Sequence, residues 1–351
     1  MLQQDDVQSA QMLQEACQQI TEQVSKVIVG QQDVVQQILI ALFAQGHCLL
    51  IGVLGLAKTL MVRTLSRALS LDFNRIQFTP DLMPADITGT EVIQEDATTG
   101  QRDFRFVTGP VFTNVLLADE INRTPPKTQA ALLEAMQERQ VTAGGKRHEL
   151  PDPFFVLATQ NPIEQEGTYP LPEAQLDRFM LNVLVDYPAE ADELEIIKQT
   201  ADATEAELSA VLDAKQILDA ARIVRQVPIA DHVARFALQL IRATRPGREE
   251  SLELVDELVM WGAGPRAGQD LVLAAKVKAL MSGRLSVDLE DIQAVAYPVL
   301  RHRVKTNFNA ESDGISSDDI IRQLIEHLLP ATDNEGRRGK LPEVFRSPDA
   351  R

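Results

Sequence analysis

The chain has 351 residues, which is enough for about two domains of ordinary size. Hydrophobic residues make up 44% and charged residues 24%, a globular composition that excludes a disordered or fibrous chain. Two cysteines are too few for a disulfide framework, so a reducing compartment is favoured. The formal net charge of −17 argues against nucleic-acid binding, because such proteins take much of their affinity from basic surfaces that release counterions.

The N-terminal segment, residues 1–6, lacks the basic and apolar pattern of a signal peptide. The apolar runs of the chain are only about five to eight residues long, too short to cross a bilayer. We therefore expect a soluble, cytoplasmic protein without direct membrane insertion.

The first elements in chain order are helical. Residues 7–45 are rich in Gln and have apolar residues at helical spacing, interrupted at residues 27–30, so two helices are expected. Helical patterns recur at residues 58–70 and 126–138. Four short apolar runs have the pattern of buried parallel strands: residues 48–51, 75–78, 115–118 and 154–158. This alternation predicts an α/β fold with a parallel sheet flanked by helices.

Two hairpins are expected to interrupt this alternation, one within residues 86–111 and one within residues 140–150, which turns at Gly144 and Gly145. Strand patterns largely vanish after residue 190, which predicts a smaller all-helical domain. The polar, glycine-rich end of the chain predicts a flexible tail. The expected division is an α/β domain at 1–190, a helical domain at 191–330 and a tail at 331–351.

The strongest local motif is GVLGLAKT at residues 52–59, which fits the phosphate-binding pattern Gly-x-x-x-x-Gly-Lys-Thr except that Ala57 replaces the last glycine. Gly52 and Gly55 let the backbone turn tightly and point N–H groups at phosphates, and the following helix adds the positive end of its dipole. Lys58 would neutralise the β- and γ-phosphates, and the Thr59 hydroxyl would ligate Mg²⁺. Nine consecutive residues are expected to contact the nucleotide: Gly52, Val53, Leu54, Gly55, Leu56, Ala57, Lys58, Thr59 and Leu60.

Polar side chains follow two later strands. Asp119 and Glu120 come directly after a buried apolar run, 61 residues beyond Lys58. Asp119 would hold Mg²⁺ through water, and Glu120 would orient and polarise the attacking water. Asn161 follows the next strand, at the carboxyl end where ligands bind in open α/β sheets. Together these motifs predict a nucleotide site.

Five motifs together resemble the MoxR-type AAA+ ATPases of the helix-2-insert clade: GVLGLAKT (52–59), LLADEINR (116–123), ATQNP (158–162), LPEAQLDRF (171–179) and GPRA (264–267). The resemblance extends from about residue 27 to about residue 303. It implies a P-loop α/β domain with a helical lid, ATP hydrolysis to ADP with Mg²⁺, and a homo-oligomeric ring, expected to be a hexamer. The two hairpins would be the helix-2 insert and the hairpin before sensor 1.

The resemblance also implies roles for single residues. Asn161 resembles sensor 1, Arg178 resembles the arginine finger that reaches the neighbouring subunit's nucleotide, and Arg266 resembles sensor 2 on the lid. Val29 and Gln31 lie in a segment similar to the one that packs against adenine. Leu54 stands where the family often has proline, which leaves the nucleotide affinity open. A client protein and a partner with a von Willebrand factor A-type domain are further implied.

Three other functions are compatible with parts of this pattern. A magnesium-chelatase-like motor subunit would share the helix-2 insert. A nucleic-acid motor would need basic hairpins, whereas the first tip, residues 95–99, is acidic to neutral and the second offers only Lys146, Arg147 and His148. A nucleotide-gated scaffold without hydrolysis is disfavoured by an intact Lys58, Asp119 and Glu120. The expected function is therefore an ATPase that remodels or matures client proteins and does not bind nucleic acid.

Overall fold

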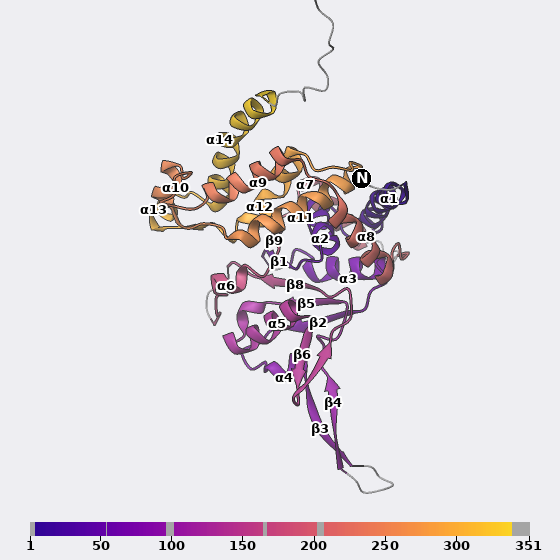
Figure 1. Ribbon diagram of the computed structural model, residues 1–351. Helices are drawn as coiled ribbons and strands as arrows, with labels where there is room; N and C mark the ends of the chain where they lie inside the picture. Colours follow the sequence, from indigo (N-terminus) through magenta and orange to yellow (C-terminus); the bar gives the residue numbers. More distant parts are fainter. Residues whose placement is uncertain (1–3, 54, 96–101, 164–166, 202–206, 339–351) are drawn as a thin grey trace, which may run out of the picture.

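The computed structural model describes residues 4–53, 55–95, 102–163, 167–201 and 207–338 (Figure 1). Its central sheet has five parallel strands in the order β2-β5-β8-β1-β9. They are β1 (Cys48–Ile51), β2 (Phe73–Gln77), β5 (Val115–Asp119), β8 (Phe155–Gln160) and β9 (Leu181–Leu184). The predicted α/β fold is confirmed. The edge strand β9 was not predicted, because the polar Asn182 interrupts its short apolar run.

Alternate side chains of the sheet belong to two different hydrophobic clusters. Cys48 and Leu50 of β1 lie in the larger cluster, whereas Leu49 between them lies in the smaller one. The larger cluster contains α1 (Gln4–Ser25), α2 (Gln32–Phe43), α3 (Lys58–Ala68) and much of the C-terminal region. The smaller cluster is built on α5 (Pro126–Glu138). Helices therefore cover both faces of the sheet, as a parallel sheet requires.

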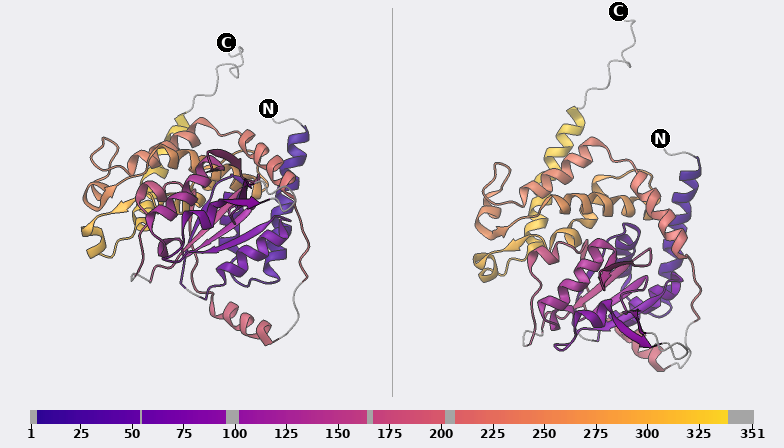
Figure 2. Two further views of the ribbon diagram at one scale, coloured as in Figure 1. Left: turned by 90° about the horizontal axis from the view of Figure 1, so that it is seen from below. Right: turned by 60° about the horizontal axis from the view of Figure 1, so that its bottom comes forward.

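The C-terminal region is mainly helical, as predicted, and packs on the α/β domain (Figure 2). Its helices are α7 (Glu190–Ala201), α8 (Ala214–Gln226), α9 (Asp231–Ala243), α10 (Glu253–Leu258), α11 (Pro265–Met281), α12 (Leu289–Leu300), α13 (Phe308–Ser312) and α14 (Ser317–Arg338). It is not strictly all-helical, because β10 (Val259–Trp261) pairs with β11 (Lys305–Thr306). The last helix also continues past residue 330, where the tail was expected to begin, and the end of that tail lies outside the described residues.

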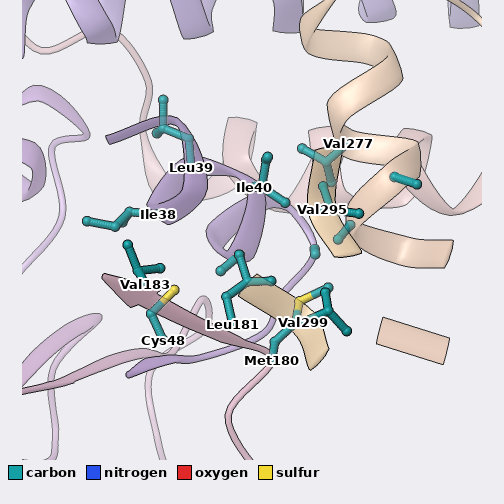
Figure 3. Close-up of a cluster of buried hydrophobic side chains, with 14 of the residues drawn as sticks. Ile38, Leu39, Ile40, Cys48, Met180, Leu181, Val183, Val277, Val295 and Val299 are labelled. Carbon is teal, nitrogen blue, oxygen red and sulfur yellow. The ribbon is translucent and has the colours of Figure 1, made fainter. Parts of the chain in front are cut away.

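The two regions share one core. Val299 of α12 lies beside Met180 and Leu181, which lead into and begin β9, and Val277 of α11 belongs to the same cluster as Ile40 of α2 (Figure 3). The long α1 contacts α3 of the first domain and also α8 and α11 of the second. Continuous apolar burial across the boundary therefore fixes the helical region against the edge of the sheet that β9 forms.

Both predicted hairpins are present. The first consists of β3 (Gly89–Glu95) and β4 (Arg102–Thr108), follows the short α4 (Pro84–Thr88) and projects from the body (Figure 1). Most of its tip lies outside the described residues. The second consists of β6 (Gln140–Ala143) and β7 (Lys146–Glu149), with positive φ at both turn glycines. Phe106 stacks on His148 with ring centroids 4.0 Å apart, which joins the two hairpins.

Two short elements complete the fold: the 3-10 helix η1 (Ile121–Arg123) follows β5, and α6 (Glu173–Leu176) precedes β9. Among the described helices, none is both long enough and apolar enough to cross a membrane.

Candidate nucleotide-binding site

The phosphate loop joins β1 to α3 with a tightly turned backbone. Gly55 has a φ of +87°, and Ala57, which caps α3, is also in the left-handed region at +53°. A Cβ at Gly52 would lie 2.5 Å from the carbonyl oxygen of Val185, so only glycine fits there. The variant Ala57 therefore keeps the conformation that glycine adopts easily. Leu54 lies outside the described residues.

The ammonium group of Lys58 lies inside this loop. Its Nζ donates hydrogen bonds to the carbonyl oxygens of Gly52 and Val53, at 2.5 and 2.7 Å. Burial lowers the pKa of Lys58, and the negative charges of Asp119 and Glu120 act in the opposite direction. A desolvated cation surrounded by backbone dipoles is suited to bind a phosphate anion.

Asp119 is the last residue of β5, and two neighbouring strands supply its partners. Its Oδ1 accepts a hydrogen bond from the Thr159 hydroxyl at 2.6 Å. Its Oδ2 pairs with the Arg75 guanidinium, also at 2.6 Å, and lies 3.5 Å from the Thr59 hydroxyl. The two residues predicted to hold Mg²⁺, Thr59 and Asp119, are therefore adjacent in space.

Glu120 is held in an uncommon backbone conformation, with φ +59° and ψ +50°. Its N–H donates to the Thr159 hydroxyl at 2.8 Å. Its Oε2 accepts a hydrogen bond from Gln77 at 2.7 Å and pairs with Arg123 at 3.1 Å. A left-handed non-glycine residue costs backbone energy and persists only where its surroundings determine it, as they do at many functional sites.

Three residues of this network were not predicted from the sequence: Arg75, Gln77 and Thr159. A signal was available for two of them, because Arg75 and Gln77 are alternate polar residues at the end of a sheet strand. The register pairs Gln77 with Asp119 directly, but that pairing is visible only once the strand order is known.

Asn161 directly follows β8 and is buried. Its Oδ1 accepts a hydrogen bond from the N–H of Ile163 at 3.2 Å. The N–H of Gly52 donates to the carbonyl oxygen of Gln160, so the residue before Asn161 touches the start of the phosphate loop. Lys58, Asp119, Glu120 and Asn161 thus all lie at or just beyond the carboxyl ends of parallel strands.

The segment expected to contact adenine also lies at the carboxyl ends of the strands. Gln31 Nε2 donates to the carbonyl oxygen of Asp186 at 2.9 Å, two residues after the end of β9. Val29 lines a cavity of about 480 Å³ together with Asp192 of α7. Of the remaining loop residues, Leu56 is buried, Val53 is half-buried and Leu60 is exposed.

Arg178 lies at the opposite end of the strands, the amino end. It precedes β9, and the N–H of Met180 donates to the carbonyl oxygen of His47, which precedes β1. Since β1 and β9 are parallel, both residues are at the amino ends of the strands, away from Lys58. Arg266 is in the first turn of α11, one helical turn before Asp270. Arg303 pairs with both Asp270 and Asp177, so Arg266 lies at the same end as Arg178. Neither guanidinium forms a hydrogen bond or ion pair with any residue that the structure describes.

Comparisons with known proteins agree with this geometry. The ATPase family associated with various cellular activities (AAA) matches residues 47–181, and the AAA lid domain matches residues 252–324. Chaperone MoxR1 of Mycobacterium tuberculosis is 41% identical over 93% of this chain and 85% of its own length. Protein MoxR of Methylorubrum extorquens is 32% identical over 83% of this chain and 88% of its own length. The chain is a MoxR-family AAA ATPase.

A solved structure from Cytophaga hutchinsonii supports the fold of this MoxR-family chain. It superposes with a TM-score of 0.84 at 41% identity, over 91% of this chain and 96% of its own. The AAA family implies that the chain binds and hydrolyses ATP.

The described residues fit ATP and a divalent cation. In the described ranges, no group of three or more His, Cys, Asp or Glu side chains is placed to hold a metal by itself. Mg²⁺ at phosphate sites is typically held by one or two carboxylates together with substrate oxygens, and it keeps several waters. Asp119 and Thr59, with their oxygens 3.5 Å apart beside the phosphate loop, suit such a shared site.

Proposed function

We propose that this MoxR-family ATPase hydrolyses ATP with Mg²⁺ at the contacts between subunits of a homo-oligomeric ring, and uses the energy to remodel or mature client proteins. The observation that carries the proposal is the separation of the site into two halves. The phosphate-binding residue and the acid pair, Lys58, Asp119 and Glu120, lie at the carboxyl ends of the strands. Arg178 and Arg266 lie at the amino ends, and their guanidinium groups are free of partners among the described residues. Each half would be completed by the opposite half of a neighbour.

The chemistry within one chain follows from the loop and the acid pair. Lys58 and the loop N–H groups would bind the phosphates, while Thr59 and Asp119 would hold Mg²⁺, which neutralises phosphate charge. Glu120 would accept a proton from the attacking water, and Asn161 would help to place that water. Val29 and Gln31 would contact the adenine.

The neighbouring subunit would supply the two arginines. Arg178 would stabilise charge that develops on the transferred phosphoryl group, and Arg266 would contact the same nucleotide from the lid. Both arginines lie at the amino ends of the strands and the phosphate loop at the carboxyl ends, so the contact would be head-to-tail. Such contacts form a closed ring when the rotation between neighbouring subunits closes. We propose a hexamer.

The name of the relative Chaperone MoxR1 supports action on client proteins. We propose, in addition, a partner protein with a von Willebrand factor A-type domain. Affinity purification of the Glu120→Gln variant with ATP, followed by mass spectrometry, tests both proposals, because slow turnover should retain bound partners.

Mixing two inactive variants tests the division of the site. Arg178→Ala should bind ATP nearly normally and hydrolyse it about 10³–10⁵-fold more slowly, the range seen for arginine fingers that act in trans. Lys58→Ala should bind no nucleotide but keep its finger. Mixed rings of the two should regain activity, because an intact loop then meets an intact finger.

The exposed Arg322 offers a matched control, because among the described residues it pairs only with Asp319 on its own helix. Arg322→Ala should keep wild-type turnover. If rings confirmed as mixed by native mass spectrometry regain no activity at any ratio, the trans assignment is wrong. A protein that stays monomeric at every ATP and protein concentration would exclude the ring.

A further inference from the structure

A buried arginine joins the lid to the segment that carries Arg178. Arg303 follows α12, and its side chain is only 2% exposed. Its Nε donates to Asp177 Oδ1 at 2.8 Å, and its Nη2 donates to Asp270 Oδ2 at 2.6 Å. Asp177 directly precedes Arg178, and Asp270 lies on α11. One cation therefore connects two carboxylates from different domains.

The same guanidinium also binds the backbone on both sides of Arg178. Its Nη2 donates to the carbonyl oxygens of Asp177 and Phe179, at 3.1 and 3.0 Å. Its Nη1 donates to those of Met180 and Val299, at 3.3 and 2.9 Å. The planar guanidinium has five N–H donors, and here six acceptors surround them. The backbone at Arg178 is therefore held from the lid.

The two residues before Arg303 bind the same segment. His302 Nε2 donates to the carbonyl oxygen of Phe179 at 3.0 Å. Arg301 Nη1 donates to that of Asn182 at 3.2 Å, and its Nη2 pairs with Asp318 of α14 at 2.8 Å. Three consecutive lid residues thus grip residues 177–182, whereas the side chain of Arg178 is left without a partner among the described residues.

We propose that Arg303 is a positioning residue for Arg178. It holds the backbone of Arg178 at the subunit edge so that the guanidinium reaches the neighbour's nucleotide. Through Asp270, one helical turn after Arg266, it ties the second arginine to the same point. This inference rests on the proposed trans role of Arg178, and Arg303 itself touches no substrate.

The geometry requires arginine rather than any cation. Lysine keeps the charge but has three donors on one atom, so it cannot span two carboxylates and several carbonyls in one plane. Arg303→Lys should therefore loosen the finger segment while it keeps the local charge balance. A misplacement of about 1 Å at a reacting group can cost about 10²-fold in rate.

The test measures how well the Arg178 of one subunit supports ATP hydrolysis in its neighbour, and not the activity of that subunit's own ATP site. Arg178→Ala subunits have an intact phosphate loop but lack the arginine finger. They are mixed with one of three donor subunits, each of which supplies its own Arg178 and cannot bind ATP. The donors are Lys58→Ala, Lys58→Ala with Arg303→Lys, and Lys58→Ala with Arg284→Met. Arg284 pairs at 2.5 Å with the buried Asp291 inside the lid, so its loss is a matched control for a broken lid ion pair.

We expect the simple donor and the Arg284→Met donor to restore ATP hydrolysis equally, and the Arg303→Lys donor to restore at least about tenfold less. Equal rescue by all three donors would overturn the role of Arg303 and leave the trans finger intact. No rescue even by the simple donor would refute the trans finger itself, and the proposal with it. The two failures are therefore distinguishable.

Folding is monitored with Trp261, the only tryptophan in the chain, whose strand β10 pairs with β11 just after Arg303. Unchanged emission and an unchanged melting temperature show that the donor is folded, and native mass spectrometry shows that it enters rings. If Arg303→Lys fails either check, Asp177→Asn replaces it in the donor, because it keeps the shape of the side chain and removes the charge. A severalfold loss of rescue then supports the proposal, and full rescue overturns it.

Discussion

The side-chain amide of Gln77 donates a hydrogen bond of 2.7 Å to Glu120 Oε2, across neighbouring strands of the sheet. Arg123 pairs with the same oxygen at 3.1 Å. Glu120 is therefore not a freely solvated acid at the end of a strand. Two polar neighbours and a left-handed backbone hold its carboxylate at the edge where the phosphate loop lies.

Replacing this carboxylate should separate ATP binding from hydrolysis. Glu120→Gln keeps the shape and the Gln77 contact but cannot take a proton from water, so turnover should fall by about 10²–10⁴. ATP affinity, measured by calorimetry, should change little. Glu134→Gln on the exposed surface of α5 is the control and should keep wild-type turnover. Wild-type turnover in Glu120→Gln would remove Glu120 from the site.

The space around two glycines, one in the phosphate loop and one in the lid, predicts opposite effects when each is replaced by alanine. A Cβ at Gly52 would meet the Val185 carbonyl at 2.5 Å, so Gly52→Ala should lower the free energy of unfolding by about 1–3 kcal/mol and weaken ATP binding. At Gly268, inside α11, a Cβ would make an ordinary contact of 3.7 Å with Ile241, so Gly268→Ala should stabilise by about 0.5–1 kcal/mol. Chemical denaturation and ATP titration would check both. Equal effects at the two sites would contradict the crowding at Gly52.

Acid should destabilise the protein through His47. Burial lowers the pKa of His47 from 6.5 to about 4, and the positive charges of Arg139 and Arg266 add to this effect. Its Nδ1 accepts from the N–H of Val156 at 3.1 Å, so a proton on Nδ1 would meet another donor. The unfolded chain binds this proton more readily, so the contribution is complete above about pH 6.5 and lost as the pH falls to about 4. It amounts to roughly 3 kcal/mol, at about 1.4 kcal/mol for each pKa unit.

Urea denaturation of wild type and His47→Gln between pH 7 and pH 4 measures this contribution. The slope of the unfolding free energy against pH should be shallower in His47→Gln, and not zero, because burial also lowers the pKa of His302. The control is His232→Gln, on the exposed surface of α9, which should keep the wild-type slope. Identical slopes in all three proteins would mean that His47 is accessible to protons in the folded state.

The acidic balance of the chain predicts that nucleic acid leaves the ATPase unaffected. Lys146 and Arg147 of β7 are exposed, but the chain has a net charge of −17, and salt screens weak electrostatic contacts with nucleic acid. Turnover at about 0.15 M salt should be unchanged by added DNA or RNA. A severalfold stimulation that Lys146→Glu abolishes would show that the second hairpin binds nucleic acid.

The phosphate loop and the acid pair could be predicted from the sequence because each depends on residues that are adjacent in the chain. Gly52, Gly55, Lys58 and Thr59 lie within eight residues, and Asp119 and Glu120 directly follow an apolar strand. The backbone turn and the side chains that bind phosphate come from neighbouring residues, so the sequence motif alone is enough to predict them. The alternation of short apolar runs and helical patterns predicted the parallel sheet for the same reason.

Only the tertiary structure decided at which end of the sheet strands Arg178 and Arg266 lie. Arg178 and Arg266 are separated from the loop by long stretches of chain, so neither motif says at which end of the strands its residue lies. The answer depends on the parallel pairing of β1 with β9, which sends the loop and Arg178 to opposite ends of the strands. The contacts of Arg303 with residues 177–180 could not be predicted either, because they span more than 120 residues of sequence. Such contacts arise when two hydrophobic surfaces pack together and bring distant polar groups into a space without water, where each must find a partner.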